Sequence, residues 1–457
     1  VRAALVTSGL TWPNRRVTVN LAPSGIRKGG VWLDLPIAIG VLVASGQVPA
    51  SRVEDVAFVG ELGLDGSLRH VPGIVPLATA LNAREVVVPA SCAPEAALIA
   101  GSRVRAASTV EGLIRALRVG SGWEVFVVRE PPAPVREPDL RDVLGQPTAR
   151  RALEVSAAGG HHLLLVGPPG SGKTMLARRL PGILPVLGRD EALEVMHVWS
   201  AAGVALPSVG LPERPPFRAP HHGATEVALV GGGTAWVRPG EVSLAHHGVL
   251  FLDELGEFSA AVLDMLREPL EDGVVRATRA RTSAELPARF LLVGAMNPCP
   301  CGEGSVSGAC RCSDRARARY VRRLSGPLLD RFDLAVSLAR PDADELIDGR
   351  SGEPSAQVAE RVSVARLEAA ARGARSNSEL PAESLDESAP LSPEASELLE
   401  RRVRSGALSA RGLHRIRRVA RTIADLDGCG AVTGAQQVAE ALSLREARSI
   451  LLREGAP

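Results

Sequence analysis

The sequence has little lysine, few aromatic side chains and no long apolar run. Of its 53 basic residues only Lys28 and Lys173 are lysine, so any site that requires a lysine must use one of these two. A strong preference for arginine is typical of a GC-rich coding sequence and carries no function by itself. Aromatic residues are 3% of the 457 residues and the formal net charge is +2, which excludes nucleic-acid binding through overall positive charge.

Other features that the sequence lacks narrow the class of protein further. The longest apolar run, Pro36–Ser45, is about half of the roughly 20 residues that a bilayer requires, and no charged leader with an apolar core opens the chain. Six cysteines, four of them between 299 and 312, do not resemble a disulfide framework. We therefore expect a soluble, cytoplasmic protein of about three domains with no membrane partner. The chain opens on Val1 in what resembles the middle of a helix, so we expect its natural start to be missing.

A proline-rich segment divides the chain. Glu130–Pro138 contains four prolines, which predicts an extended linker over residues 131–139. Residues 1–130 combine strand-like runs with helical patterns, and they predict a compact α/β domain. The runs are Arg16–Asn20, Val56–Val59 and Glu85–Pro89, and the clearest helix covers Leu35–Ala44.

Residues 140–340 predict a second α/β domain with a parallel sheet, because helical or loop stretches separate its strands. The strands are Leu163–Val166, Val249–Leu252, Phe290–Val293 and Leu334–Leu338. From 341 to 457 no further strand is expected. This part is helical, with a mobile polar loop over Arg372–Pro393 and an apolar stripe on its last long helix. The stripe consists of Leu413, Ile416, Val419 and Ile423.

A glycine-rich segment between the first of these strands and a helix matches the phosphate-binding loop pattern. Its residues are Gly167, Pro168, Pro169, Gly170, Ser171, Gly172, Lys173 and Thr174. Glycines let successive backbone N–H groups surround the phosphates of a bound nucleotide at the helix N-terminus. Lys173 then contacts the β- and γ-phosphates, and the Thr174 hydroxyl coordinates Mg²⁺. The pattern predicts ATP and Mg²⁺ as cofactors.

Two carboxylates, Asp253 and Glu254, follow the apolar strand Val249–Leu252. Open α/β sheets bind ligands at the carboxyl ends of their strands, so these carboxylates are expected beside the phosphate-binding loop. Asp253 would complete the Mg²⁺ shell, and Glu254 would polarise the attacking water. Surface carboxylates that act only as caps are the alternative.

Three further positions each admit two interpretations. Asn297, at the end of a third strand, either orients the water or the γ-phosphate or is an ordinary turn residue. Arg331 is either a surface ion-pair residue or an arginine finger that reaches the γ-phosphate of a neighbouring subunit. Arg411 opens a helix on which Arg415 and Arg418 share its face. That face is either solvated or carries a sensor that closes a helical lid onto the nucleotide.

Four cysteines form two Cys-x-Cys pairs separated by eight residues. They are Cys299, Cys301, Cys310 and Cys312. Four thiolates can hold Zn²⁺ tetrahedrally, but Cys-x-Cys is tighter than the usual Cys-x₂-Cys spacing. We favour zinc, because clustered cysteines in a reducing compartment usually bind a metal. Four reduced thiols in a loop are the alternative.

Several stretches, together with the phosphate-binding loop, carry a specific family pattern. They are Asn20–Ser24 with Asp34–Ala38, Phe217–His222, Arg238–His246, Met296–Gly302 and Val419–Leu426. On these residues nearly the whole chain resembles the ComM/YifB-type members of the magnesium-chelatase-like branch of AAA+ ATPases. The family normally begins several dozen residues before the position of Val1.

The resemblance implies a P-loop AAA+ core with a parallel sheet and a C-terminal helical lid, working as a hexameric ring. It implies that Asn297 is the first sensor, Arg331 a finger acting on a neighbouring subunit, and Arg411 the second sensor, with Arg415 one turn away as the alternative. ComM-type members are thought to drive branch migration of DNA during recombination of incoming strands, so the expected partner is single-stranded or branched DNA. True magnesium-chelatase subunits instead insert Mg²⁺ into a porphyrin.

The N-terminal domain resembles the proteolytic domain of Lon, which uses a Ser–Lys dyad in its active members. Alignment with the serine loop places Trp32 at the nucleophile, and a second segment places Val75 at the lysine. Neither side chain can act as a nucleophile or a base. The domain is therefore expected to be degenerate and without peptidase activity. Lys28 has no role that we can assign.

Leu270–Arg281 is typical of a β-hairpin that starts at Asp272-Gly273. In the resembled branch a hairpin before the first sensor lines the pore of the ring. Arg276, Arg279 and Arg281 would either contact DNA phosphates there or be charges on a solvated strand edge.

These features predict a Mg²⁺-dependent ATPase motor that remodels DNA. The alternatives are a metal-insertion subunit that acts on a porphyrin and a protein-remodelling chaperone whose Lon-like domain binds partners. Because the overall charge is near neutral, any DNA site must be a local feature of the pore.

Overall fold

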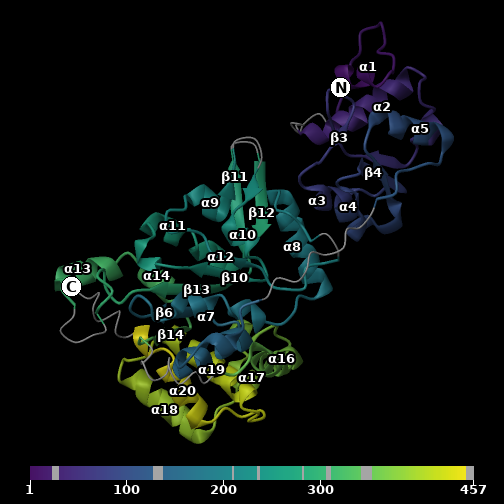
Figure 1. Cartoon of the computed structure of the whole chain (residues 1–457). Coiled ribbons are helices and arrows are strands. Elements are labelled where there is room, and N and C mark those ends of the chain that lie inside the picture. The colour runs from purple at the N-terminus through teal and green to yellow at the C-terminus, as the bar shows by residue number, and fades with distance from the viewer. Residues whose placement is uncertain are drawn as a thin grey trace. The chain divides into compact units, whose positions relative to one another are not determined.

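The computed structural model describes residues 1–22, 30–126, 137–207, 210–233, 237–279, 282–304, 310–340 and 352–448. The chain divides into two compact units (Figure 1). The first contains Val1–Pro134 and Ala192–Pro212, and the second contains Val135–Glu191 and Glu213–Pro457. Lys28 and the proline-rich residues 127–136 lie outside the described residues. In the described part of the chain, no helix is long and apolar enough to cross a membrane.

The first unit is built on a three-stranded parallel sheet in the order β1-β4-β5. Alternate residues of β4 enter two apolar clusters, with Val87 in one and Val86 and Val88 in the other, because neighbouring side chains of a strand point to opposite faces. The strands are β1 (Val56–Phe58), β4 (Glu85–Pro89) and β5 (Val104–Ala107), with the hairpin β2 (Glu61–Leu62) and β3 (Leu68–Arg69). The helices are α1 (Arg2–Thr7), η1 (Val31–Leu33), α2 (Asp34–Ala44), η2 (Ala50–Arg52), α3 (Ile74–Ala80), α4 (Ala93–Ala100), η3 (Gly101–Arg103) and α5 (Val110–Val119).

Residues 192–212 join this unit although they follow the phosphate-binding loop in sequence. Helix α8 (Arg189–Ala202) places Met196 in the second apolar cluster of the unit. The Ser200 hydroxyl accepts a hydrogen bond from the Val75 N–H at 3.2 Å, and the Ser200 carbonyl accepts one from the Gly73 N–H at 2.9 Å. The helix therefore contributes a wall of the first unit through both apolar and polar contacts.

The expected strand at Arg16–Asn20 is wrong. The structure has irregular backbone there, and Val17 and Val19 are exposed by 37% and 50%. A strand needs a neighbour for its backbone N–H and C=O groups. Among the described residues this segment has none, so its alternating pattern has no sheet to join.

The second unit contains a five-stranded parallel sheet in the order β14-β6-β13-β10-β7. The expected parallel sheet is confirmed, with β13 at its centre and β6 beside it. A short strand at the edge, β7, was not predicted from the sequence. The strands are β6 (Leu163–Val166), β7 (Phe217–Arg218), β10 (Val249–Leu252), β13 (Leu291–Met296) and β14 (Leu334–Ser337). This mixed α/β architecture is consistent with a P-loop AAA+ core.

Both faces of the sheet are covered. Leu163 and Leu165 of β6 belong to one apolar cluster and Leu164 belongs to the other, which is why the strands are apolar throughout rather than alternating. The helices of this core are η4 (Leu140–Asp142), α6 (Pro147–Gly159), α7 (Lys173–Ala177), η5 (Leu180–Gly182), α9 (Glu226–Val230), α10 (Glu241–Leu244), η6 (Leu255–Glu257), α11 (Ala260–Asp264), α12 (Arg267–Asp272), α13 (Asp314–Val321) and α14 (Gly326–Leu329). Two hairpins complete it, β8 (Gly231–Gly232) with β9 (Arg238–Pro239), and β11 (Val274–Arg279) with β12 (Thr282–Pro287).

Helices follow the sheet in the chain (Figure 1), and the longest of them, α16 and α19, pack against α6. The expected apolar stripe lies on α19, where Ile416, Val419 and Ile423 are fully buried. The elements are α16 (Ser355–Ala371), η7 (Asn377–Glu379), α17 (Leu385–Ser388), α18 (Pro393–Arg404), α19 (Ala410–Leu426) and α20 (Ala435–Ser443).

The expected mobile loop over Arg372–Pro393 is wrong. This segment forms η7 and α17, and its Leu380 and Leu385 are buried in a small apolar cluster. Asn377 is fully buried and donates hydrogen bonds to the Thr422 hydroxyl at 3.1 Å and to the Asp425 carboxylate at 2.7 Å. A polar segment is fixed here by hydrogen bonds to α19, which its composition does not reveal.

Candidate functional site

The phosphate-binding loop connects β6 to α7 at the carboxyl edge of the sheet. Gly170 and Gly172 have φ angles of 78° and 87°, a backbone conformation that side chains with a Cβ rarely adopt. A Cβ on Gly167 would lie 2.7 Å from the Leu338 carbonyl oxygen at the end of β14. The glycines therefore allow a left-handed loop between an internal strand and a helix, the arrangement that binds phosphate.

Lys173 lies at the centre of this loop. Its Nζ donates hydrogen bonds to the carbonyl oxygens of Gly167 at 2.6 Å and Pro168 at 2.8 Å, and to Oδ1 of Asn297 at 3.3 Å. Burial lowers the pKa of the ammonium group, and the negative charge of Asp253 opposes that shift. The ammonium group is therefore held between the loop and the end of a neighbouring strand.

Thr174 and Asp253 meet beside this lysine. The Thr174 hydroxyl, at the start of α7, donates a hydrogen bond of 2.6 Å to Oδ2 of Asp253. Asp253 directly follows β10. Mg²⁺ prefers oxygen ligands and is usually held by one or two such groups together with substrate phosphates. The two oxygen atoms lie close enough to serve one ion, so this pair fits the predicted Mg²⁺.

Glu254 has an unusual backbone and an unexpected partner. Its φ is 51°, in the left-handed region, and such strain in a residue other than glycine is concentrated at functional sites. Its Oε2 lies 2.9 Å from Nδ1 of His222, four residues after β7. No spacing or composition around His222 predicts this contact. The signal available was that Phe217–His222 carries the family pattern.

Asn297 directly follows β13. The strand end is joined to the loop by a hydrogen bond of 3.1 Å from the Gly167 N–H to the Met296 carbonyl oxygen. The structure thus brings Lys173, Thr174, Asp253 and Asn297 together, with Glu254 adjacent to Asp253 in the chain. Three neighbouring strands of the sheet position these side chains.

Comparison with known families gives three matches along the chain. The model described as "Magnesium chelatase, subunit ChlI" matches residues 139–346, and its C-terminal counterpart matches residues 352–445. A further model, "Subunit ChlI of Mg-chelatase", matches residues 1–92. The first two cover the sheet with its site and the helices that follow it.

Relatives match over nearly the full length. A Mycobacterium tuberculosis protein is 45% identical over 98% of this chain and 90% of its own. The competence protein ComM of Haemophilus influenzae is 43% identical over 94% of this chain and 85% of its own, and YifB of Escherichia coli is 41% identical over 99% and 89%. The chain belongs to the ComM/YifB-type magnesium-chelatase-like family. Membership suggests a competence-related ATPase that uses ATP and Mg²⁺.

Two more distant matches cover part of the chain. The magnesium-chelatase 38 kDa subunit of Cereibacter sphaeroides is 29% identical over 44% of this chain and 58% of its own. Lon protease 2 of Bacillus subtilis is 29% identical over 36% of this chain and 34% of its own. Similarity to a chelatase subunit and to Lon is therefore partial, whereas similarity to ComM and YifB is nearly complete.

Arg331 lies where the strands of the sheet begin, whereas the phosphate-binding loop lies where β6 ends. It lines a cavity of about 860 Å³ together with His162, Gly248 and Phe290, which precede β6, β10 and β13. The four-residue strand β6 alone separates the two edges by about 13 Å. Arg331 forms an ion pair with Glu271 on this side of the sheet.

Arg411 and Arg415 lie on the same side as Arg331. Burial lowers the pKa of Arg331, and the positive charges of Arg415 and Arg411 lower it further. Arg415 lines the cavity, with Nη1 3.7 Å from Oδ1 of Asp333, whereas Arg411 is exposed. Burial would raise the pKa of Asp333, but His161 and Arg415 hold it well below its usual range. The cavity therefore has several arginines in its wall, and Arg415 lies beside the ionised carboxylate of Asp333.

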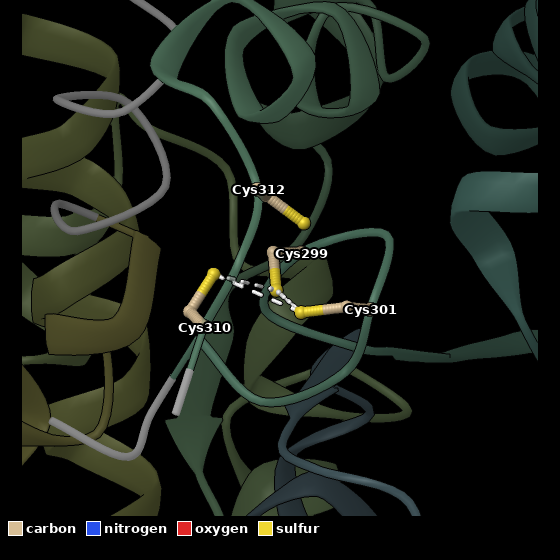
Figure 2. A group of neighbouring side chains, drawn as sticks. All are labelled: Cys299, Cys301, Cys310 and Cys312. Carbon is tan, nitrogen blue, oxygen red and sulfur yellow. Dashed lines mark hydrogen bonds between the residues drawn. The ribbon is translucent and has the colours of Figure 1, made fainter. Parts of the chain in front are cut away.

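The four cysteines gather at one point beside Asn297 (Figure 2). All are free thiols, and their sulfur atoms lie within 4.8 Å of one another. Cys299 is buried, Cys301 is exposed, and the other two are half-buried. Backbone N–H groups of Glu303 and Arg311, with the Cys299 thiol, lower the pKa of Cys301 to about 6.

The predicted hairpin forms from β11 and β12, and it starts directly after Asp272-Gly273 as expected. Gly273 has a φ of 69° and ends α12, and β11 starts at the next residue. Arg276 is paired with Glu268 at 2.8 Å, Asp272 at 2.6 Å and Glu285 at 3.1 Å, and these carboxylates raise its pKa. Arg276 is therefore engaged within the protein. Arg281 and the side chain of Arg279 lie outside the described residues.

The positions aligned with the Lon dyad share one apolar cluster. Val75 is fully buried in it, and Trp32 packs against it from η1. The same cluster contains Cys92, whose pKa burial raises to about 11. An apolar wall occupies the positions where the resemblance would place a nucleophile and a base.

Proposed function

We propose that this chain is a Mg²⁺-dependent ATPase that works as a ring of identical subunits, six by family resemblance, and remodels DNA. The observation that carries the ATPase proposal is the convergence of Lys173, Thr174, Asp253 and Asn297 at one edge of the sheet. Phosphoryl transfer depends on positioning and charge stabilisation, and this set supplies an ammonium group, two oxygen ligands and an amide.

Each residue has a proposed role in hydrolysis. The loop residues 167–172 bind the phosphates, and Lys173 neutralises charge on the β- and γ-phosphates. Thr174 and Asp253 hold Mg²⁺, which supplies charge neutralisation when it is bound. Glu254 accepts a proton from the attacking water, and Asn297 orients that water or the γ-phosphate. His222 holds the carboxylate of Glu254 in place through its Nδ1.

The ring proposal is supported by the location of Arg331. An arginine at the edge opposite its own phosphate-binding loop can act only on a nucleotide bound by another subunit. We propose Arg331 as that finger, with Arg411 or Arg415 as a second cation contributed from the same side. Because each active site then needs two chains, hydrolysis requires assembly.

The DNA proposal is supported by the 43% identity to the competence protein ComM. The magnesium-chelatase 38 kDa subunit matches 44% of this chain, whereas ComM matches 94%, so we favour a ComM-like role over metal insertion. Arg276 is already paired with three carboxylates, so we propose Arg279 and Arg281 rather than Arg276 for the phosphate contacts in the pore.

The test is the steady-state ATPase rate with no DNA, with single-stranded DNA and with branched DNA, each at two salt concentrations. Stimulation that weakens as salt rises supports a motor on DNA, because phosphate contacts release counterions. A rate that DNA does not change contradicts the DNA proposal but leaves the ATPase proposal intact. A protein that hydrolyses no ATP under any of these conditions contradicts both.

A further inference from the structure

The cysteine cluster has the dimensions of a four-thiolate metal site. Sγ of Cys299 lies 3.3 Å from Sγ of Cys301 and 3.6 Å from that of Cys310, and Cys301 and Cys310 are 3.7 Å apart. Four sulfurs bound to Zn²⁺ at about 2.3 Å are about 3.8 Å apart in a tetrahedron. A disulfide would require about 2.05 Å. With all four sulfurs within 4.8 Å of one another, the separations are close to those around a shared metal ion and far longer than a disulfide bond.

We propose that Cys299, Cys301, Cys310 and Cys312 bind one Zn²⁺ ion, which holds the phosphate-binding loop and Asn297 in position. The metal site rests on the sulfur geometry and on the backbone groups around the sulfurs, and it does not depend on the ATPase proposal. Only its link to nucleotide rests on the proposed ATPase function.

Backbone groups around the sulfurs support metal ligation over four independent thiols. The N–H groups of Glu303 and Arg311, one from each arm of the cluster, donate hydrogen bonds to Cys301. The N–H of Cys301 does the same for Cys299. Such outer contacts orient thiolate ligands and partly offset their negative charge. They fit a site in which four thiolates share one divalent cation.

The metal would close a ring of contacts around Asn297. The first arm of the cluster begins two residues after Asn297, and the second leads into α13, which Ser313 caps through the Ala316 N–H at 3.3 Å. The far end of α13 returns to the same point, because the Tyr320 hydroxyl accepts a hydrogen bond from the Asn297 backbone. Linking the two arms therefore fixes both ends of the segment that positions Asn297.

The cluster also touches the phosphate-binding loop. A Cβ on Gly302, which has a φ of 83°, would lie only 2.6 Å from Cδ of Pro169. Arg340 bridges the same two segments, with Nη2 2.6 Å from Glu303 and Nε 3.4 Å from the Pro169 carbonyl oxygen. The turn between Cys301 and Glu303 therefore rests directly on the loop that binds phosphate.

Metal analysis of reduced, chelator-free protein tests the site. We expect one zinc per chain in the natural sequence and in the Cys429→Ser control, which removes an exposed thiol elsewhere. The double variant Cys310→Ser/Cys312→Ser should contain none. Replacing zinc with Co²⁺ should give the absorption bands of a tetrahedral thiolate complex. Natural protein with neither zinc nor these bands overturns the proposal, and circular dichroism identifies a variant that lacks zinc only because it is unfolded.

Equilibrium binding of a fluorescent ATP analogue tests the link to the loop. The folded double variant should bind at least about tenfold more weakly than the Cys429→Ser control, as expected when an outer support of a site is lost. Equal affinity would overturn the positioning role. Lys173→Ala should show the reverse pattern, with nucleotide binding lost and zinc retained. A failure of the ATPase proposal is thereby separated from a failure of the zinc proposal.

Discussion

At the scale of single residues, Lys173 is the clearest case of a side chain that chemistry restricts. The chain uses arginine almost everywhere, yet this buried position in the loop is lysine. Its ammonium group contacts three oxygen acceptors within 3.3 Å, a compact arrangement that the broad planar guanidinium of arginine cannot reproduce. The preference for arginine over lysine is therefore broken at a position where the geometry of the phosphate site requires lysine.

We predict that Lys173→Arg lowers the steady-state ATPase rate by at least about 100-fold, as does Lys173→Ala, because a positioned donor to the transferring phosphate is lost. Arg141→Lys, at a largely exposed side chain, is the matched control and should keep the natural rate. Thermal unfolding curves establish that the variants are folded. A Lys173→Arg protein with a tenth or more of the natural rate would contradict this account of the site.

Glu254 and His222 yield a second prediction at this scale. Glu254→Gln should reduce kcat by roughly 10²- to 10⁴-fold while nucleotide affinity is kept, because the base is lost and the phosphate contacts remain. His222→Ala should reduce kcat by about tenfold, since the carboxylate loses the contact that orients it. His221→Ala is the neighbouring control. If both histidine variants behave alike in a kcat and KM comparison, the pairing has no role in turnover.

At the scale of elements, α19 depends on a buried ionic network as well as on its apolar stripe. Arg421 is 1% exposed, and its Nη2 and Nε donate to Oδ1 of Asp425 at 2.8 and 3.1 Å. The other carboxylate oxygen accepts from Asn377 and Arg372. One carboxylate thus neutralises a buried guanidinium and fixes the polar segment before α18.

We predict that Asp425→Asn destabilises these helices by about 3 kcal/mol, because it leaves the Arg421 charge buried without a counter-ion. Asp386→Asn is the control, since that aspartate pairs with Arg417 at an almost fully exposed side chain. Hydrogen exchange of the α19 amides measures the local free energy of opening. Similar exchange rates in the two variants would mean that burial of the pair does not matter.

The elements also show what a sequence can predict. The bounds of β6 and β10 match the predicted runs, because fully buried parallel strands are continuous apolar segments. β7 has two residues and no period that a pattern could reveal. The prediction of a mobile loop over residues 372–393 was wrong because hydrogen bonds to α19 fix this segment. Composition alone does not show which residues a segment contacts in the folded protein. The same holds for His222, which meets Glu254 only through the packing of β7 beside β10.

At the scale of the whole molecule, the residues proposed for ATP hydrolysis lie in two groups, at the two opposite ends of the strands of one sheet. The loop, the carboxylates and Asn297 follow the strands, whereas Arg331 and Arg415 line a cavity at the ends where the strands begin. Sequence motifs identify both sets, but the separation between them depends on strand direction and order. Parallel strands of four to six residues keep these edges apart within one chain.

This separation makes a complementation experiment decisive for the ring. Lys173→Ala removes the phosphate site and keeps the arginine edge, and Arg331→Ala does the opposite. Each variant alone should be inactive, with a loss of about 10³-fold or more for the finger. Mixed before assembly, they should regain a substantial part of the natural rate, because some interfaces then pair an intact loop with an intact finger.

The double variant mixed with natural protein is the control and should only dilute activity. If the mixture stays inactive at concentrations where light scattering detects oligomers, Arg331 does not act on a neighbouring nucleotide.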